Sequence, residues 1–381
     1  MDTTALPPMH TWLAECNDPL TNNVLSRMRQ LPDVVHLAVM PDVHPASDTC
    51  VGTALATDRL IYPSAVGGDI GCGMLALAFD AEASQLGRPE VAARLLRLLD
   101  GKIPSMRHHR SRTIAFPPSL HGAELSHPAL SAHLRTEAHL QLGTLGGGNH
   151  FIEFQADSDD QLWLMIHSGS RSLGQVIRAH HIAAARQSPP HSNLPSLDAT
   201  MAPGKAYLHD AAIACTFADA NRRAMATLAI AAVKQILNAE PDIASVISCD
   251  HNHVRLETHF GRQLYVHRKG AMPADDRLPG IIPGSMGTQS FHVVGRGHPL
   301  ALRSASHGAG RRLSRVAARS RFKNADVKHQ LRNIWYDPRQ LSALREEVPH
   351  AYKDIRTVMR AQEDLISITR KLTPILSYKG P

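Results

Sequence analysis

Glycine-rich loops that carry candidate ligands are the feature that most constrains this chain of 381 residues. The segment 306–311 reads Ser-His-Gly-Ala-Gly-Arg, and the segments 69–73, 146–150 and 167–171 also set an aspartate, cysteine, histidine or arginine beside glycines. Because glycine lacks a Cβ atom, the backbone of such a loop approaches a ligand closely. Several of these loops in one chain favour a fold that gathers them around a metal-dependent phosphoryl or nucleotidyl transfer site.

The composition indicates a globular protein with a large core. Hydrophobic residues make up 43% of the chain and charged residues 20%, which excludes the disordered class. Aromatic residues make up only 4%, and this argues against a nucleic-acid binder built on aromatic stacking platforms. The formal net charge of +7 favours a polyanionic partner.

Cysteine usage and the N-terminal sequence bear on the compartment. The five cysteines are widely spread and form no CxxC pair, as is typical of proteins in a reducing cytosol. The first residues lack the basic-then-apolar order of a signal peptide, and no apolar run approaches the roughly 20 residues that span a bilayer. We therefore expect a cytoplasmic protein without a membrane partner.

Hydrophobic patterns predict a mixture of strands and helices. Strands are expected at 34–40, at 51–66 with a break at Pro63, at 74–79, at 162–166 and, with turns, over 262–295. Helices are expected at 88–99, 206–238 and 352–370. The basic segment 102–125 is expected to be an exposed loop, and the proline-rich segment 186–204 an exposed excursion. Candidate ligands occur from residue 69 to 307 without segregating, so we predict one intertwined α+β catalytic domain over 1–381, with central β-sheets flanked by helices.

A metal site is suggested by residues that lie far apart in the sequence. Asp69 and Cys72 share one glycine-rich loop, His150 follows three glycines, His167 ends an apolar run, and His251 lies in Cys-Asp-His-Asn-His. A thiolate, a carboxylate and imidazoles together suit a divalent ion such as zinc, manganese or iron. Each residue also has a structural interpretation: Cys72 as a small buried residue, Asp69 as a turn former, and the histidines as hydrogen-bonded residues.

Phosphate contacts have their own candidates. The loops 143–149 and 282–287 are able to wrap a phosphate with backbone amides, although both also read as tight turns. The first loop lacks the lysine and the spacing of a Walker A or dinucleotide motif. Three arginines are better candidates, because a guanidinium binds phosphate through two hydrogen bonds: Arg171, Arg311 and Arg315.

The motifs become specific when they are taken in order. They are Met40–His44, Asp69–Met74, Leu142–Glu153, His167–Arg171, Pro283–Gly287, Ser306–Arg311 and Tyr378–Gly380. This series resembles the RtcB family of RNA ligases over residues 33–380. The resemblance implies an RtcB-like ligase domain that depends on GTP and manganese. It further implies a reaction that joins an RNA 2′,3′-cyclic phosphate or 3′-phosphate end to a 5′-hydroxyl end, in RNA repair or tRNA splicing.

The resemblance also implies a role for individual residues. His307 is implied as the nucleophile that takes GMP as a phosphoramidate. The implied ligands of two Mn²⁺ ions, bridged by Cys72, are Asp69, Cys72, His150, His167 and His251. The implied GTP pocket comprises Asn149, Phe151, Ile152, Glu153, Asn252, Pro283, Gly284, Ser285, Met286, Ser290, Gly308, Ala309, Gly310 and Lys379. Arg171 is implied to engage the RNA phosphate, and Asp42 to do so or to support the ligands from a second layer.

One loop departs from the family pattern. After Met40–His44 the family continues Leu-Gly-Lys-Gly, whereas residues 45–50 here read Pro-Ala-Ser-Asp-Thr-Cys. The loss of a lysine and two glycines predicts a stiffer loop with less attraction for phosphate, and we expect it to affect the RNA substrate or the joining step.

Two other functions fit parts of the sequence. A metal-dependent RNA end-processing phosphodiesterase opens cyclic phosphate ends without ligation, and it needs the metals but neither His307 nor GTP. A basic RNA-binding or chaperone protein needs only the fold, and the intact set of candidate ligands argues against it. We expect RNA ends as the partner, with an activating protein as a further candidate partner.

Overall fold

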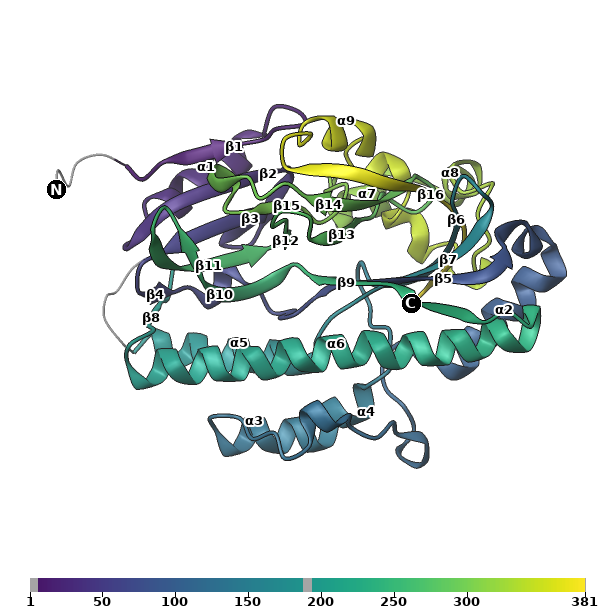
Figure 1. Cartoon of the computed structure of the whole chain (residues 1–381), viewed down its shortest axis with the longest axis horizontal. Coiled ribbons are helices and arrows are strands. Elements are labelled where there is room, and N and C mark those ends of the chain that lie inside the picture. Colours follow the sequence, from purple (N-terminus) through teal and green to yellow (C-terminus); the bar gives the residue numbers. More distant parts are fainter. Residues whose placement is uncertain (1–5, 188–193, 381) are drawn as a thin grey trace.

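Two large β-sheets form the framework of the protein (Figure 1). The structure is a computed structural model and describes residues 6–187 and 194–380. The seven-stranded sheet has the order β13 (Pro279–Ile282), β14 (Ser290–Gly295), β16 (Ile366–Lys379), β6 (Phe151–Ala156), β7 (Gln161–Ser168), β5 (Gly73–Glu82) and β9 (Pro241–Asp250). The five-stranded sheet has the order β1 (Met9–Thr11), β2 (Val34–Ala46), β3 (Thr49–Thr57), β11 (Arg262–Lys269) and β10 (Asn252–His259).

Two short strand pairs and a set of helices complete the described fold. The pairs are β4 (Leu60–Ile61) with β8 (Leu197–Asp198), and β12 (Ala271–Pro273) with β15 (Ser304–Ser306). The helices are α1 (Pro19–Arg29), α2 (Pro89–Lys102), α3 (Pro128–His133), α4 (His139–Gln141), α5 (Ser172–Ala185), α6 (Ala202–Leu237), α7 (Arg315–Arg321), α8 (Asn324–Gln330) and α9 (Ile355–Arg360). Figure 1 shows α6 running along one side of the sheets, with α3 and α4 beyond it. The architecture is mixed α+β, with helices flanking the sheets, as the sequence predicted.

The central strand β5 explains why this part of the sequence reads as an unbroken apolar run. Leu75 and Leu77 face one side, where they pack in a core cluster with Leu95 of α2 and Met225 of α6. Alternate residues such as Met74 face the other side and join a second cluster. Since side chains alternate between the two faces of a strand, a strand that is covered on both faces needs apolar residues throughout.

Most elements lie where the hydrophobic patterns predicted them. The strands expected at 74–79 and 162–166 are the middle parts of β5 and β7, and the helices expected at 88–99 and 206–238 are α2 and α6. The strand expected at 34–40 does not end at Pro41 but continues to Ala46. Its pairing with β3 is irregular between Val39 and His44, and such an irregularity accommodates a proline, which cannot donate to the ladder.

The expected C-terminal helix is wrong. Only Ile355–Arg360 is helical, and residues 366–379 form the long strand β16. That strand lies inside the sheet, paired with β14 on one side and β6 on the other. Partners more than 70 residues away in sequence therefore decide its conformation, and a local pattern does not contain them.

Two segments expected to be exposed are covered in part. In 102–125, Ile103, Leu120 and Leu125 are buried. In 186–204, residues 188–193 lie outside the described residues, but Leu197 and Ala199 are buried and Leu197 pairs with Ile61 of β4. Residues 194–199 therefore form a short, mostly covered connection. No helix in the described ranges is long and apolar enough to span a membrane.

Candidate metal centre and nucleotide pocket

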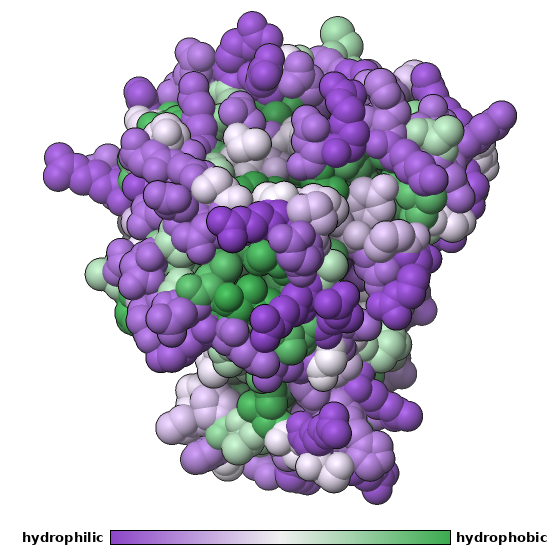
Figure 2. Space-filling model, turned by 90° about the vertical axis from the view of Figure 1, so that its right-hand side faces the viewer, coloured by the Kyte–Doolittle hydropathy of each residue, from purple (hydrophilic) through white to green (hydrophobic). Residues whose placement is uncertain are grey.

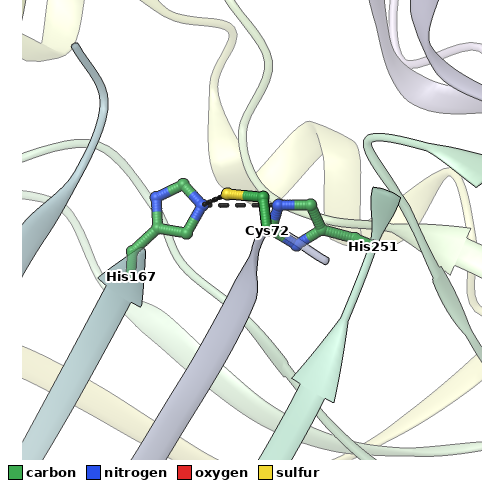
Figure 3. Close-up of side chains that lie close together, drawn as sticks. All are labelled: Cys72, His167 and His251. Atoms are coloured by element: carbon green, nitrogen blue, oxygen red, sulfur yellow. Dashed lines mark hydrogen bonds between the residues drawn. The ribbon is translucent and has the colours of Figure 1, made fainter. Parts of the chain in front are cut away.

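Three candidate metal ligands lie at one edge of the seven-stranded sheet. Cys72 immediately precedes β5, His167 lies near the end of β7, and His251 immediately follows β9. The antiparallel register sets Gly73 opposite both Ser168 and Asp250, which brings the three ligands side by side. The Cys72 Sγ and His167 Nε2 atoms are 3.3 Å apart, as are the Nε2 atoms of His167 and His251. Figure 3 shows the three side chains converging from adjacent strands.

Asp69 and His150 form a second trio with the same cysteine. His150 Nε2 lies 2.8 Å from Asp69 Oδ2 and 3.6 Å from Cys72 Sγ. In each trio the three ligand atoms all lie within 4.8 Å of one another. The structure thus brings together all five residues that the resemblance implied, in two groups that share Cys72. A thiolate, a carboxylate and three imidazoles form a donor set that suits divalent transition-metal ions.

Backbone carbonyl groups orient two of the imidazoles. His150 Nδ1 lies 2.9 Å from the Leu145 carbonyl oxygen, and His167 Nδ1 lies 3.0 Å from the Asn149 carbonyl oxygen. A carbonyl oxygen only accepts, so Nδ1 carries a proton in both rings; the lone pair of a neutral ring is then at Nε2, which faces the cluster. Burial lowers the pKa of His167 well below its usual range, which keeps this ring neutral and available as a ligand.

The charges of the other two ligands depend on their neighbours. Burial raises the pKa of Asp69, but the charge and hydrogen bond of a His150 ring protonated at Nε2, together with a hydrogen bond from Cys72, outweigh this effect and hold the pKa at about 2. Burial also raises the pKa of the Cys72 thiol well above its usual range. A bound divalent cation reverses the effect on the thiol, because it stabilises the thiolate directly.

The loop of Asp69 fits closely against its surroundings. A Cβ atom at Gly169 would lie 2.1 Å from Asp69 Oδ1, so this position requires glycine. The side chain of Asn252 donates from Nδ2 to the Asp69 backbone carbonyl oxygen at 3.1 Å. The backbone carbonyl oxygen of Asn252 accepts from the Gly71 amide at 2.7 Å. Asn252 therefore positions the ligand loop, and it does not line the pocket described below.

His307 lies beside this cluster and is held by a buried carboxylate. Its Nδ1 atom is 2.6 Å from Asp42 Oδ2, and its backbone amide donates to the same oxygen at 3.1 Å. Asp42 is fully buried. The His307 ring packs edge-to-face on the ring of His251, with 4.8 Å between the centroids. Because the carboxylate accepts from Nδ1, the neutral ring presents its lone pair at Nε2.

A pocket opens beside His307. Eleven of the fourteen implied GTP residues line it: Asn149, Phe151, Glu153, Pro283, Gly284, Ser285, Met286, Gly308, Ala309, Gly310 and Lys379. The other three are Ile152, Asn252 and Ser290. Ile152 packs in the core cluster beneath β6, since it alternates with the pocket-facing residues of that strand. Ser290 lies behind the wall, where its hydroxyl oxygen accepts from the Gly284 amide at 3.2 Å.

Two buried ionisable residues, Glu153 and Lys379, line the wall of the pocket. Burial raises the pKa of Glu153 to about 8, although Gln155 donates a hydrogen bond to its carboxylate and Lys379 lies nearby. Lys379 is the last residue of β16 and is 9% exposed. Its Nζ donates to the Gly148 carbonyl oxygen at 2.7 Å and lies 3.3 Å from Glu347 Oε2. This lysine is therefore fixed in the wall by its strand and is not a free terminal charge.

Sequence reasoning missed part of the pocket wall. Glu347, Tyr352 and Ser377 line the pocket, although no motif marks them. The Tyr352 hydroxyl donates to Glu347 Oε2 at 2.7 Å and accepts from Arg311 at 2.9 Å. The one available signal was Arg311, which the sequence had already suggested as a phosphate ligand.

Arg171 has a different environment from the other suggested phosphate ligands. Arg311 and Arg315 both line the pocket. Arg171 instead donates to the Ser105 carbonyl oxygen at 3.1 Å and to the Thr144 hydroxyl at 3.2 Å. These two bonds tie its guanidinium to neighbouring loops, outside the pocket lining.

Comparison with known proteins identifies the family of this chain. The family model described as tRNA-splicing ligase RtcB matches residues 24–380. The chain is 38% identical over 372 residues to the RNA-splicing ligase RtcB of Escherichia coli K12, covering 91% of this chain and 90% of that protein. It is 37% identical over 372 residues to RtcB1 of E. coli ATCC 25922, with the same two coverages, and 33% identical over 374 residues to RtcB2 of that strain, covering 92% and 89%. The chain therefore belongs to the tRNA-splicing ligase RtcB family and is an RNA-ligase enzyme.

Proposed function

We propose that this ligase joins RNA 2′,3′-cyclic phosphate or 3′-phosphate ends to 5′-hydroxyl ends with GTP and two Mn²⁺ ions, and that His307 accepts GMP. The observation that carries the proposal is the position of His307. Its oriented ring lies between the cluster formed by the two trios of candidate metal ligands and a pocket lined by most of the implied guanylate residues. A cytoplasmic location and an activating protein partner stay predictions.

The Asp42–His307 pair supports a nucleophilic role. Asp42 accepts from Nδ1 at 2.6 Å, so the Nε2 lone pair is free to attack the α-phosphorus of GTP. An N–P bond forms as the bond to the bridging oxygen breaks, and pyrophosphate leaves. A buried carboxylate also stabilises the positive charge that develops on the ring, as in other oriented histidines.

The candidate cluster has the donor types that manganese ions need. Asp69, Cys72 and His150 would hold one ion, and Cys72, His167 and His251 the other. Bound there, the ions would neutralise negative charge on phosphate oxygens next to His307.

Glu153 in the pocket wall supports a preference for guanine. Glu153 is buried and lies near Lys379. Its ionised carboxylate accepts from the N1–H and N2–H₂ donors of guanine, and adenine does not offer this pair. A mismatched base leaves buried polar groups unpaired, and this cost is what discriminates strongly between substrates.

Incubation with GTP labelled at the α-phosphate, in the presence of Mn²⁺, tests the proposal. The protein should acquire an acid-labile, base-stable label, and His307→Ala should lose the label and RNA joining while keeping its metal content. His109→Ala, a change at an exposed histidine, serves as the control and should label normally. A label that survives in His307→Ala would assign the nucleophile elsewhere. If enzyme that carries no GMP label opened RNA cyclic phosphate ends without joining them, this would support the phosphodiesterase alternative.

A further inference from the structure

The excess of positive over negative charge in this chain lies in one segment. Residues 311–332 contain eight of the 41 lysines and arginines but only one of the 34 acidic residues, Asp326. The rest of the chain is therefore balanced, with 33 residues of each sign, and this one segment accounts for the whole formal excess of +7. An ordinary solvated helix face carries charges of both signs, so this imbalance is unusual for two surface helices.

Packing turns six of these eight cations outward, whereas Arg311 and Arg315 line the His307 pocket. The segment forms the end of the His307 loop, then α7 and α8. Ala318, Phe322, Val327 and Leu331 are buried in one core cluster beneath the two helices. The charged residues on the opposite face are exposed. Figure 2 shows the side of the molecule where α8 and α2 lie in Figure 1, and its surface is largely hydrophilic around an apolar centre.

The cations near the pocket are paired, whereas those farther along are not. Arg315 and Arg319 both lie within ion-pair distance of Glu346. Among the residues that the structure describes, no carboxylate lies within ion-pair distance of Arg321, Lys323, Lys328 or Arg332. Four unpaired cations on 12 consecutive residues repel one another, and an external polyanion relieves this repulsion.

The surface is continuous with the site. Arg315, the first residue of α7, lines the His307 pocket, and its guanidinium lies close to Gly148 in the triple-glycine loop. Arg315 also lines a second groove with Arg312 and Lys353. A chain of cations thus runs from the pocket rim onto the exposed face of α7 and α8.

We propose that the exposed cations of residues 312–332, here called the basic surface, hold the phosphate backbone of the RNA strand that extends away from His307. The occupant is RNA because the enzyme is an RNA ligase and the surface begins at its candidate nucleophile. The contacts involve charge and no base edges, so they are independent of sequence and weaken with salt. This inference rests on RNA joining but not on the guanylylation chemistry.

The test compares charge-neutralised enzymes. Arg321→Gln/Lys328→Gln/Arg332→Gln removes three exposed cations of the basic surface. The matched control, Arg27→Gln/Lys205→Gln/Arg277→Gln, removes three exposed cations elsewhere and changes the net charge equally. A third variant neutralises Arg107, Arg110 and Arg112 in the basic segment 102–125. RNA affinity is measured as a function of salt, alongside the yield of protein labelled by GTP.

The first variant should bind RNA more weakly, with a log–log salt slope smaller by about 2, because each single-strand phosphate contact contributes roughly 0.7. Its labelling by GTP should stay normal, which separates this result from a failure of the proposed guanylylation. An equal loss in the Arg27/Lys205/Arg277 control would overturn the inference, since net charge alone would then explain binding. A loss confined to the Arg107/Arg110/Arg112 variant, or unchanged affinity in the first variant, would overturn it as well.

Discussion

The candidate metal cluster is built on strand ends, whereas the nucleotide pocket is built mainly on loops and one C-terminal strand. Cys72, His167 and His251 sit at the ends of three neighbouring strands, so the sheet register sets their spacing. In the pocket, Arg311 and Lys379 come from segments that are far apart in sequence and meet at Glu347. The metal side is oriented by backbone carbonyls, and the nucleotide side by buried opposite charges.

This difference predicts different responses to substitution. A shared metal ligand has no substitute, because both trios depend on one sulfur atom. The pocket distributes its contacts over many side chains, so the loss of one group should weaken nucleotide binding by a limited factor.

The largest effect is expected from Cys72→Ala. Both trios lose their common ligand, so bound manganese should fall from two equivalents to a small residue and RNA joining should be abolished. Metal content after dialysis, measured together with joining activity, checks this. Cys50→Ala removes a buried thiol from a different core cluster and should keep both. Retention of two metal equivalents by Cys72→Ala would contradict the shared-ligand arrangement.

Asp42→Asn tests the connection between the metal cluster and the nucleotide pocket. The substitution keeps the shape but weakens acceptance from His307 Nδ1, so the productive tautomer is disfavoured. Guanylylation should slow by on the order of 10²–10⁴-fold, with metal content unchanged. Single-turnover labelling by GTP measures the rate, and Asp48→Asn, at an exposed position in the following turn, is the control. An unchanged rate would mean that Asp42 has no part in orienting the nucleophile.

Lys379→Met should weaken binding in the nucleotide pocket and leave the metal cluster intact. Removing the ammonium leaves the buried Glu347 without one of its cationic partners, and breaking such a pair costs about 2–5 kcal/mol. The concentration of GTP needed for half-maximal labelling should rise by at least tenfold, and deleting residues 379–381 should act in the same direction. Lys371→Met changes an exposed lysine on the same strand and should have no effect. If Lys379→Met reduced metal content instead, the metal cluster and the nucleotide pocket would not be separable.

The pH dependence of GTP binding should report on Glu153. In the protein without nucleotide, burial raises the pKa of the Glu153 carboxyl to about 8. Guanine is expected to bind the ionised form of this carboxyl. Below pH 8 binding must therefore expel a proton, so the affinity should rise about tenfold per pH unit between pH 6 and 8 and then level off. The measurement is made at saturating Mn²⁺, because metal binding is itself pH-dependent. Glu153→Gln should bind GTP more weakly and without this slope; a slope that persists would assign the proton to another group.

The smallest effect is expected from the loop that departs from the family pattern. Ser47 and Asp48 form the exposed tip between β2 and β3, and Ser47 has a φ of 50°. Pro45 lines the groove that contains Arg312 and Lys353. Replacing 45–50 with Leu-Gly-Lys-Gly-Ser-Thr should change the RNA-joining rate severalfold and leave the labelled yield unchanged. A parallel change in both would place this loop in the nucleotide step.

The C-terminal region shows where sequence reasoning failed. Residues 352–370 suggested a helix, but β16 begins at Ile366 and obtains its hydrogen bonds from β14 and β6. The same strand carries Lys379 into the pocket. From the sequence alone, Lys379 could equally be a solvated charge near the C-terminus. Glu347 and Tyr352 were missed for a related reason: no motif marks them, and only their contacts with Arg311 and Lys379 identify them.

The sequence by itself determined the family, the mixed fold class and the residue types of the candidate site, because glycine loops and ligand residues occur in a specific order along 33–380. The tertiary structure decided how those residues meet. It grouped five ligands into two trios around Cys72, placed Asp42 against His307 and set eleven implied residues around one pocket. It also turned six of the eight cations of residues 311–332 outward. These relations depend on strand register and on contacts between distant segments, which local propensity and periodicity do not encode.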